Sequence, residues 1–164
     1  MIKRKWHSVI FIASVLICTL TACGQKSELV RVPEDALTKL FTVSDYSLTH
    51  LDDKSKYLTT LENTYEAYFT SEAFDGFGAD RLAARYVGLA EKEGVLISVK
   101  DVQLSKTKEE NKNTSFDFQI NLVLKHTKSK EEISKSQSGQ LTVTTESGKT
   151  KISRLYIVPD NLFK

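Results

Sequence analysis

The sequence predicts an α+β domain in which three N-terminal helices pack on a curved four-stranded antiparallel sheet. Between residues 33 and 93, apolar side chains recur at the three- and four-residue spacing of amphipathic helices. From Val95 onward they alternate with polar side chains, which is the period of half-buried strands. Because an apolar sheet face must be covered, the helices are expected to form one layer over that face.

The first helix is expected to begin at Pro33, because proline suits a first helical turn and Glu34 and Asp35 suit the positive end of the helix dipole. The second is expected to follow Asp52 or Asp53, since an aspartate oxygen can accept the unpaired amides of a first turn. The apolar face of this second helix comprises Leu58, Leu61, Tyr65, Tyr68 and Phe69.

The third helix is expected to begin at Asp80 and to end at Gly94, since glycine readily adopts the left-handed conformation that closes a helix. Two glycines interrupt the pattern before it. Residues 70–78 are therefore interpreted as a break, with at most a short helical turn over residues 71–74.

The four strands are expected around residues 95–104, 116–124, 141–143 and 152–158. In the first strand the apolar parity shifts near Lys100 and Asp101, which predicts a β-bulge there. In the second, the phenylalanines take the core face and Asp117 faces water. Residues 146–149 are typical of a hairpin turn, whereas residues 105–113 and 126–132 are interpreted as longer polar connections.

The chain opens with Lys3-Arg4-Lys5 and an apolar stretch that ends at Leu20-Thr21-Ala22-Cys23. A basic start, a short apolar middle and small residues before a cut are typical of a secretory signal. The final four residues resemble the lipobox of bacterial lipoproteins. The resemblance implies that residues 1–22 are removed and that Cys23 becomes a lipidated N-terminus, held on a membrane by its acyl chains. An uncut signal anchor and an ordinary secretory signal are the alternatives.

Gly24 and the compact basic start favour the outer face of a Gram-positive cytoplasmic membrane over a periplasm. Residues 23–32 are expected to form a flexible tether, and residues 33–164 a single extracytoplasmic domain. Because Cys18 leaves with the signal, the mature chain has no free thiol. Three of the 23 Lys and Arg leave as well, so 20 stand against 21 Asp and Glu. This balance excludes a nucleic-acid binder that relies on net positive charge.

Three helices followed by a four-stranded meander, over residues 34–158, resemble the cone-shaped nuclear-transport-factor-like and cystatin-like folds. That resemblance implies a pocket between the helices and the sheet. The same fold occurs in extracytoplasmic domains of Gram-positive conjugation machinery, so the resemblance suggests an accessory role in a conjugation or secretion assembly. A fold alone does not decide among the functions that it supports.

The sequence holds no motif for a cofactor or a metal, and neither is predicted. His50 and His126 lie far apart and have no second ligand at helical or hairpin spacing. Neither a nucleophile elbow nor a phosphate-binding glycine loop occurs. No catalytic residue is therefore predicted, and the protein is not expected to be an enzyme.

One enzymatic alternative stays open, because cone folds can hold an acid beside a tyrosine or histidine in their pocket. Asp101 or Asp117 would be the acid, and its neighbour would be Tyr65, Tyr86 or His126. The parity of the second strand disfavours Asp117, and tyrosines at helical spacing are commonly core residues.

Aromatic side chains carry the binding hypothesis. Phe74 and Phe77 lie in the predicted break and could lid the open end of the cone, which Tyr65 and Tyr86 would line. The alternative is that these side chains fill the core. The sequence thus predicts a membrane-anchored, non-enzymatic domain that binds a protein partner or a small apolar ligand. A surface sensor or inhibitor is a further alternative.

Overall fold

The structure is a computed structural model that describes residues 27–51, 53–159 and 162. The predicted signal, Cys23 and Asp52 lie outside the described residues. In the part that is described, four α-helices precede a four-stranded sheet, with short 3-10 turns at Ser47–His50 and Glu66–Tyr68. The helices are α1 (Glu28–Phe41), α2 (Lys54–Tyr65), α3 (Ser71–Ala79) and α4 (Leu82–Glu93). The strands are β1 (Val95–Glu110), β2 (Asn113–His126), β3 (Glu132–Glu146) and β4 (Lys149–Ile157).

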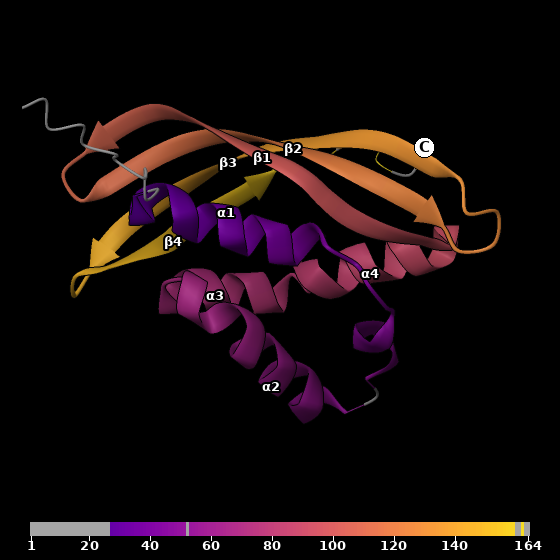
Figure 1. The fold of residues 1–164 in the computed structure, drawn as a ribbon. Helices are drawn as coiled ribbons and strands as arrows, with labels where there is room; N and C mark the ends of the chain where they lie inside the picture. The colour runs from indigo at the N-terminus through magenta and orange to yellow at the C-terminus, as the bar shows by residue number, and fades with distance from the viewer. Residues whose placement is uncertain (1–26, 52, 160–161, 163–164) are drawn as a thin grey trace, which may run out of the picture.

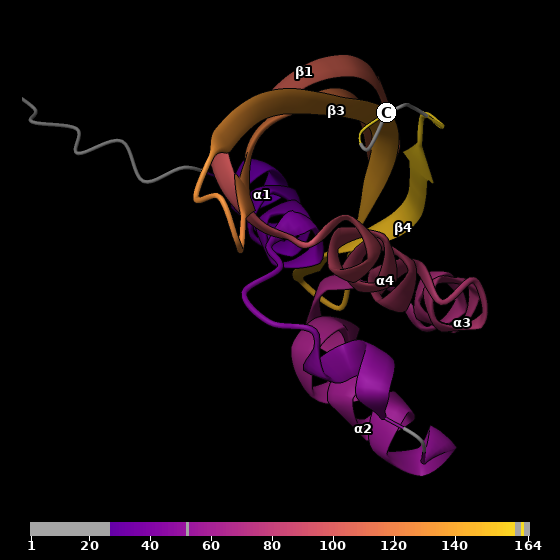
Figure 2. The same ribbon diagram turned by 90° about the vertical axis from the view of Figure 1, so that its right-hand side faces the viewer.

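The strands lie in chain order and every neighbouring pair is antiparallel, so the predicted α+β class and meander are confirmed. Figure 1 shows the sheet on one side of the molecule and the helices on the other. In the view of Figure 2, the strands arch over α1, α4 lies beneath β4, and α2 lies farthest from the sheet. The core forms between these layers, where Phe41, Ile120 and Ile152 have no exposed surface.

The first helix begins at Glu28 and contains Pro33, so the prediction that residues 28–32 belong to a flexible tether is wrong. Val32 and Pro33 are buried, which extends the apolar face of α1 upstream of the predicted start. Arg31 also pairs with Glu28 and with Asp35, each at 3.3 Å, across neighbouring turns. The burial of the apolar face outweighs the backbone hydrogen bond that a proline inside a helix loses.

The predicted break over residues 70–78 is also wrong, since α3 occupies most of it. Thr70 caps α3, because its side chain accepts a hydrogen bond from the amide of Ala73 at 3.3 Å. Phe77 is buried on the inner side of this helix, and that burial offsets the poor helix propensity of its two glycines. The preceding helix ends at Tyr65 rather than at Phe69, which pairs instead with Ile152 of β4 in an isolated parallel bridge.

Other helix ends follow the predictions. Asp53 caps α2, because its carboxylate accepts a hydrogen bond from the amide of Ser55 at 2.7 Å. Gly94 closes α4 in the left-handed region, with a φ of 64°. The third predicted helix is therefore confirmed, although it begins at Leu82 rather than at Asp80.

The strands show the predicted local features but run farther than predicted. The β-bulge lies between Val99 and Asp101, and the last hairpin turns at Ser147 and Gly148, both with positive φ. The polar segment 105–113 is not a long connection, because β1 continues to Glu110 and a two-residue turn leads directly into β2. The charged side chains that suggested a loop extend the hairpin beyond the core and lie in solvent.

Candidate functional site

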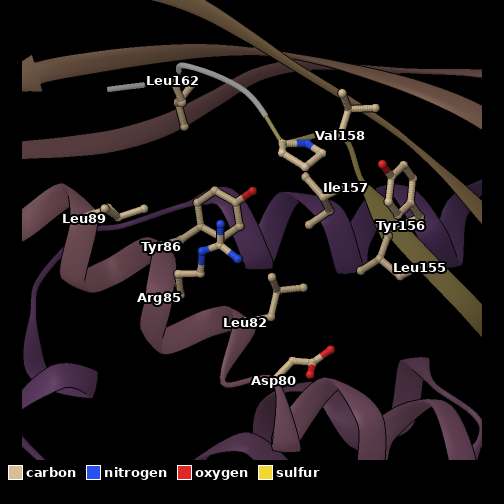
Figure 3. Close-up of a pocket in the computed structure, with 11 residues that line it drawn as sticks. Asp80, Leu82, Arg85, Tyr86, Leu89, Leu155, Tyr156, Ile157, Val158 and Leu162 are labelled. Carbon is tan, nitrogen blue, oxygen red and sulfur yellow. The ribbon is translucent and has the colours of Figure 1, made fainter. Parts of the chain in front are cut away.

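A cavity of about 250 Å³ lies between α4 and the second half of β4 (Figure 3). Its apolar wall on the helix side comes from Leu82 and Leu89 of α4, which are half-buried. Leu155 and Ile157 of β4 form the facing wall and pack against the core. The cavity is therefore a cleft between the helical layer and one edge of the sheet.

The mouth of the cavity carries both charged and apolar side chains that are exposed. Asp80, from the turn before α4, and Arg85, from α4 itself, bring opposite charges to it, and both side chains are exposed. Tyr156 and Val158 are 53% and 40% exposed at the same mouth. The arrangement can hold an apolar side chain inside while polar groups meet it at the rim.

The backbone of β4 is open along the same cleft. The amide of Val158 donates to the carbonyl of Ser138 of β3 at 3.0 Å. Because hydrogen-bonded and non-bonded pairs alternate in an antiparallel ladder, the backbone groups of Leu155 and Ile157 point away from β3. No backbone hydrogen bond from another described residue reaches them on that side.

In the first half of the same edge, the chain itself bonds to β4 at Ile152. The amide of Thr70 donates to the carbonyl of Ile152 at 3.0 Å, next to the bridge between Phe69 and Ile152. The edge of β4 is thus bonded at Ile152, and among the described residues none forms a backbone hydrogen bond with it from Leu155 onward. Leu162, which follows β4 and is 3% exposed, also lines the cleft.

The charge of β4 is uniformly positive. Its sequence holds Lys149, Lys151 and Arg154 and no acidic residue. None of the three forms an ion pair with any residue that the structure describes. A partner with acidic groups would meet unpaired cations along this strand.

The four aromatic residues predicted to bind a ligand do not surround one cavity. Tyr86 lines the cleft beside β4, with its ring 4.7 Å from that of Phe41. Tyr65 lines a different cavity, next to α1. The rings of Tyr65 and Phe77 lie 5.0 Å apart, and those of Phe74 and Phe77 lie 6.4 Å apart. Ligand binding by these residues stays a prediction.

Tyr65 is held as a neutral phenol. Its hydroxyl donates to the carbonyl of Lys39 at 3.3 Å. Burial, with a smaller contribution from Tyr57, raises the pKa of Tyr65 to about 12, because the charged phenolate would lose its hydration. A raised pKa suits a structural hydroxyl and not a base that acts near neutral pH.

The acid and tyrosine pairs of the enzymatic alternative are not brought together. Asp101 and Asp117 are both exposed, and they accept hydrogen bonds from Gln103 at 2.8 Å and from Gln140 at 2.9 Å. Both lie on the outer face of the sheet, whereas the buried tyrosines lie with the helices beneath it. Among the described residues, no three His, Cys, Asp or Glu side chains lie close enough together to hold a metal ion.

A search for membrane-spanning helices within the described residues finds none that has the length and apolar character to cross a bilayer. No family model matches the chain, and no curated protein has a matching sequence.

Solved structures do share the fold. An IcmL-like type IV secretion system protein from Legionella pneumophila matches with a TM-score of 0.58 at 13% identity, over 83% of this chain and 94% of that one. The periplasmic domain of DotI matches with a TM-score of 0.52 at 14% identity, over 83% of this chain and 97% of that one. At these identities the likeness establishes a common fold and nothing more.

The chain also weakly resembles a putative NTF2-like transpeptidase from Campylobacter jejuni, with a TM-score of 0.30 at 17% identity. That match covers 74% of this chain and 97% of the other, but the likeness is too slight to argue from.

The sequence patterns do not by themselves predict this cleft. Residues 155–158 are four apolar residues in succession, which departs from the alternation expected of a strand with one wet face. That run is the available signal for an exposed apolar edge.

Proposed function

We propose that this protein is a membrane-anchored extracytoplasmic lipoprotein that binds a protein partner as an accessory subunit of a secretion or conjugation assembly. The observation that carries the proposal is the cleft between α4 and β4, on a fold shared with two type IV secretion proteins. The lipid on Cys23 would supply the location and the domain would supply the contact.

The character of the cleft supports a protein partner over a small apolar ligand. At about 250 Å³ it is smaller than the usual range of small-molecule sites, which begins at about 300 Å³. Tyr156 and Val158 line its mouth and are largely exposed, so a small ligand inside the cleft would cover them only in part. A folded or extended polypeptide can cover both the cleft and its exposed rim.

Site-specific photocrosslinking on intact cells tests the contact. A photoreactive amino acid placed at position 156 is expected to capture a discrete protein, while the same group at Gln119, on the outer face of β2, is not. Capture of the same protein from both positions, or of none from position 156, would contradict the proposal.

The anchor needs a separate measurement. Replacing Cys23 by Ala is expected to abolish incorporation of labelled palmitate and to leave the signal uncut or the domain released from the membrane. Incorporation of the label into that variant would contradict lipidation at Cys23. Mass spectrometry of the native protein provides the matching positive result.

A further inference from the structure

We propose that the open half of the β4 edge binds an extended segment of the partner, rich in apolar and acidic residues, which adds to the sheet as a fifth strand. This inference rests on the proposed function and specifies how its partner is recognised. It follows from three properties of the same few residues: their backbone, their side chains and their charge.

The backbone supplies the pairing groups. Leu155 and Ile157 each direct an amide and a carbonyl away from β3, and no described residue pairs with them. A row of unpaired edge groups is a template for another strand, and several recognition domains bind peptides in this way. The chain already uses the neighbouring part of the edge, where Thr70 bonds to Ile152.

The side chains around the cleft select an apolar residue on one face of the added strand. Alternate residues of a strand point to opposite faces, so every second residue of the segment would face the helices. Leu82 and Leu89 of α4 lie there, on the far wall of the cleft (Figure 3). Burial of apolar surface in the cleft would then add to the backbone hydrogen bonds.

The charge selects acidic residues on the other face and argues against a second copy of this chain. Arg154 is exposed on the outer face, next to the open half of the edge, whereas Lys149 is exposed and Lys151 half-buried in the first half of the strand. None of the three forms an ion pair with a described residue. Two β4 strands side by side would bring like charges together, whereas acidic residues would complement them. Asp80 is the acidic group at the mouth of the cleft, on the helix side.

A designed peptide tests the pairing without relying on protein variants that could misfold. The probe is a labelled peptide of alternating valine and glutamate, titrated against the full-length chain in detergent and followed by fluorescence polarisation. Saturable binding is expected. In a β-strand all the valine amides face one edge and all the glutamate amides the other. N-methylation of one set should therefore abolish binding, and N-methylation of the other set should preserve it.

Charge is tested with a matched pair of variants. Arg154→Glu is expected to weaken binding of the valine–glutamate peptide by about tenfold. Lys128→Glu makes the same charge change on the exposed β2–β3 connection and is expected to leave binding unchanged. A peptide of alternating valine and lysine should not bind.

Several outcomes would overturn the proposal. These are the absence of saturable binding, equal effects of the two N-methylated peptides, or equal binding of the lysine peptide. Self-association through the β4 edge, in place of peptide binding, would assign the edge to a second copy. If position 156 still crosslinks to a partner in cells, such a result removes strand addition but not partner binding. If the peptide binds and the crosslink is absent, the assembly role fails instead.

Discussion

The two edges of the sheet, β1 and β4, differ in the side chains and β-bulges that accompany their unpaired backbone groups. Along β1, the pairing with Val43 ends near Ile97, and the remaining edge carries charges and β-bulges. The charged residues are Lys100, Asp101, Lys106, Lys108, Glu109 and Glu110. The open half of the β4 edge, from Leu155 onward, has neither charged residues nor a β-bulge and presents apolar residues instead.

Charges and bulges are the features by which natural proteins keep edge strands from pairing with other chains. In β1, Lys106 pairs with Glu109 and Lys108 pairs with Glu110, so the guarding charges balance one another. The cations of β4 form no ion pair with a described residue. By this comparison, the edge of β1 carries features that oppose pairing and the open half of the β4 edge does not.

The largest expected effect comes from the core that both edges share. Phe118 of β2 is 3% exposed, and Phe118→Ala is expected to lower the free energy of unfolding by about 3–5 kcal/mol. Denaturant unfolding measures the loss. Asp117→Ala, one residue away on the outer face, should change it by no more than about 0.5 kcal/mol. Equal stabilities of the two variants would show that the core face is misassigned.

A second substitution should loosen β4 while sparing β1. A Cβ added at Gly139 would lie 2.2 Å from the carbonyl oxygen of Tyr156 and 2.4 Å from the ring of Phe118. Gly139→Ala is therefore expected to cost about 3 kcal/mol through overpacking, and hydrogen exchange should accelerate in β4 more than in β1.

Gly76→Ala is the matched control for that substitution, because a Cβ there meets no atom within 4 Å. In a helix interior the change should stabilise the protein by about 0.5–1 kcal/mol. Uniform acceleration of exchange across the sheet in Gly139→Ala would contradict a selective effect on β4.

Alkaline pH should weaken the support behind β4. The Tyr65 ring packs on Phe77, which packs on Phe69 beside Ile152, at 5.0 Å between ring centres in both ring pairs. Because the pKa of Tyr65 is raised from 10.0 to about 12, the folded state favours the neutral phenol. The contribution of the neutral Tyr65 side chain to the free energy of unfolding is complete below pH 10. The free energy of unfolding falls by about 2 kcal/mol as the pH rises toward 12.

Denaturant unfolding between pH 9 and pH 12 measures this loss. Tyr65→Phe removes the ionisable group and should flatten the pH dependence by that amount, while Tyr156→Phe, at an exposed tyrosine, should not. Identical pH profiles for the parent and Tyr65→Phe would contradict the assignment.

The smallest effect on stability is expected from removing the charged side chains at the end of β1. The same change tests whether these charges keep the β1 edge from pairing. Replacing Lys106, Lys108, Glu109 and Glu110 together by threonine should change the free energy of unfolding by no more than about 0.5 kcal/mol, since all four are exposed. Sedimentation velocity at rising concentration is expected to reveal new association. A variant that associates no more than the parent would show that the charges do not guard this edge.

The accurate sequence predictions depended on local signals. Residue type predicts the helix cap at Asp53, the helix end at Gly94 and the turn at residues 147–148. A shift in the alternation of apolar residues predicts the β-bulge near Asp101. Helix α3 was missed because its glycines outweigh its apolar residues locally, and the burial of Phe77 that stabilises it is a tertiary effect.

The open edge could not be predicted for a related reason. The apolar run at residues 155–158 is visible in the sequence, but only the strand order makes β4 an edge. Only the register with β3 shows which backbone groups of Leu155 and Ile157 point outward. Tyr86 was selected as a ligand-binding residue and does line the cleft, although its predicted neighbours lie elsewhere.

α1 begins at Glu28, so a lipid on Cys23 would leave only residues 24–27 as a linker, with a reach of roughly 17 Å between the two positions. Figure 1 shows that the start of α1 lies at the same end of the sheet as the β1–β2 and β3–β4 turns. A bilayer would then face those turns. Because β4 runs away from the β3–β4 turn, the open half of its edge would lie on the side of the domain away from the bilayer. A neighbouring subunit could reach it there.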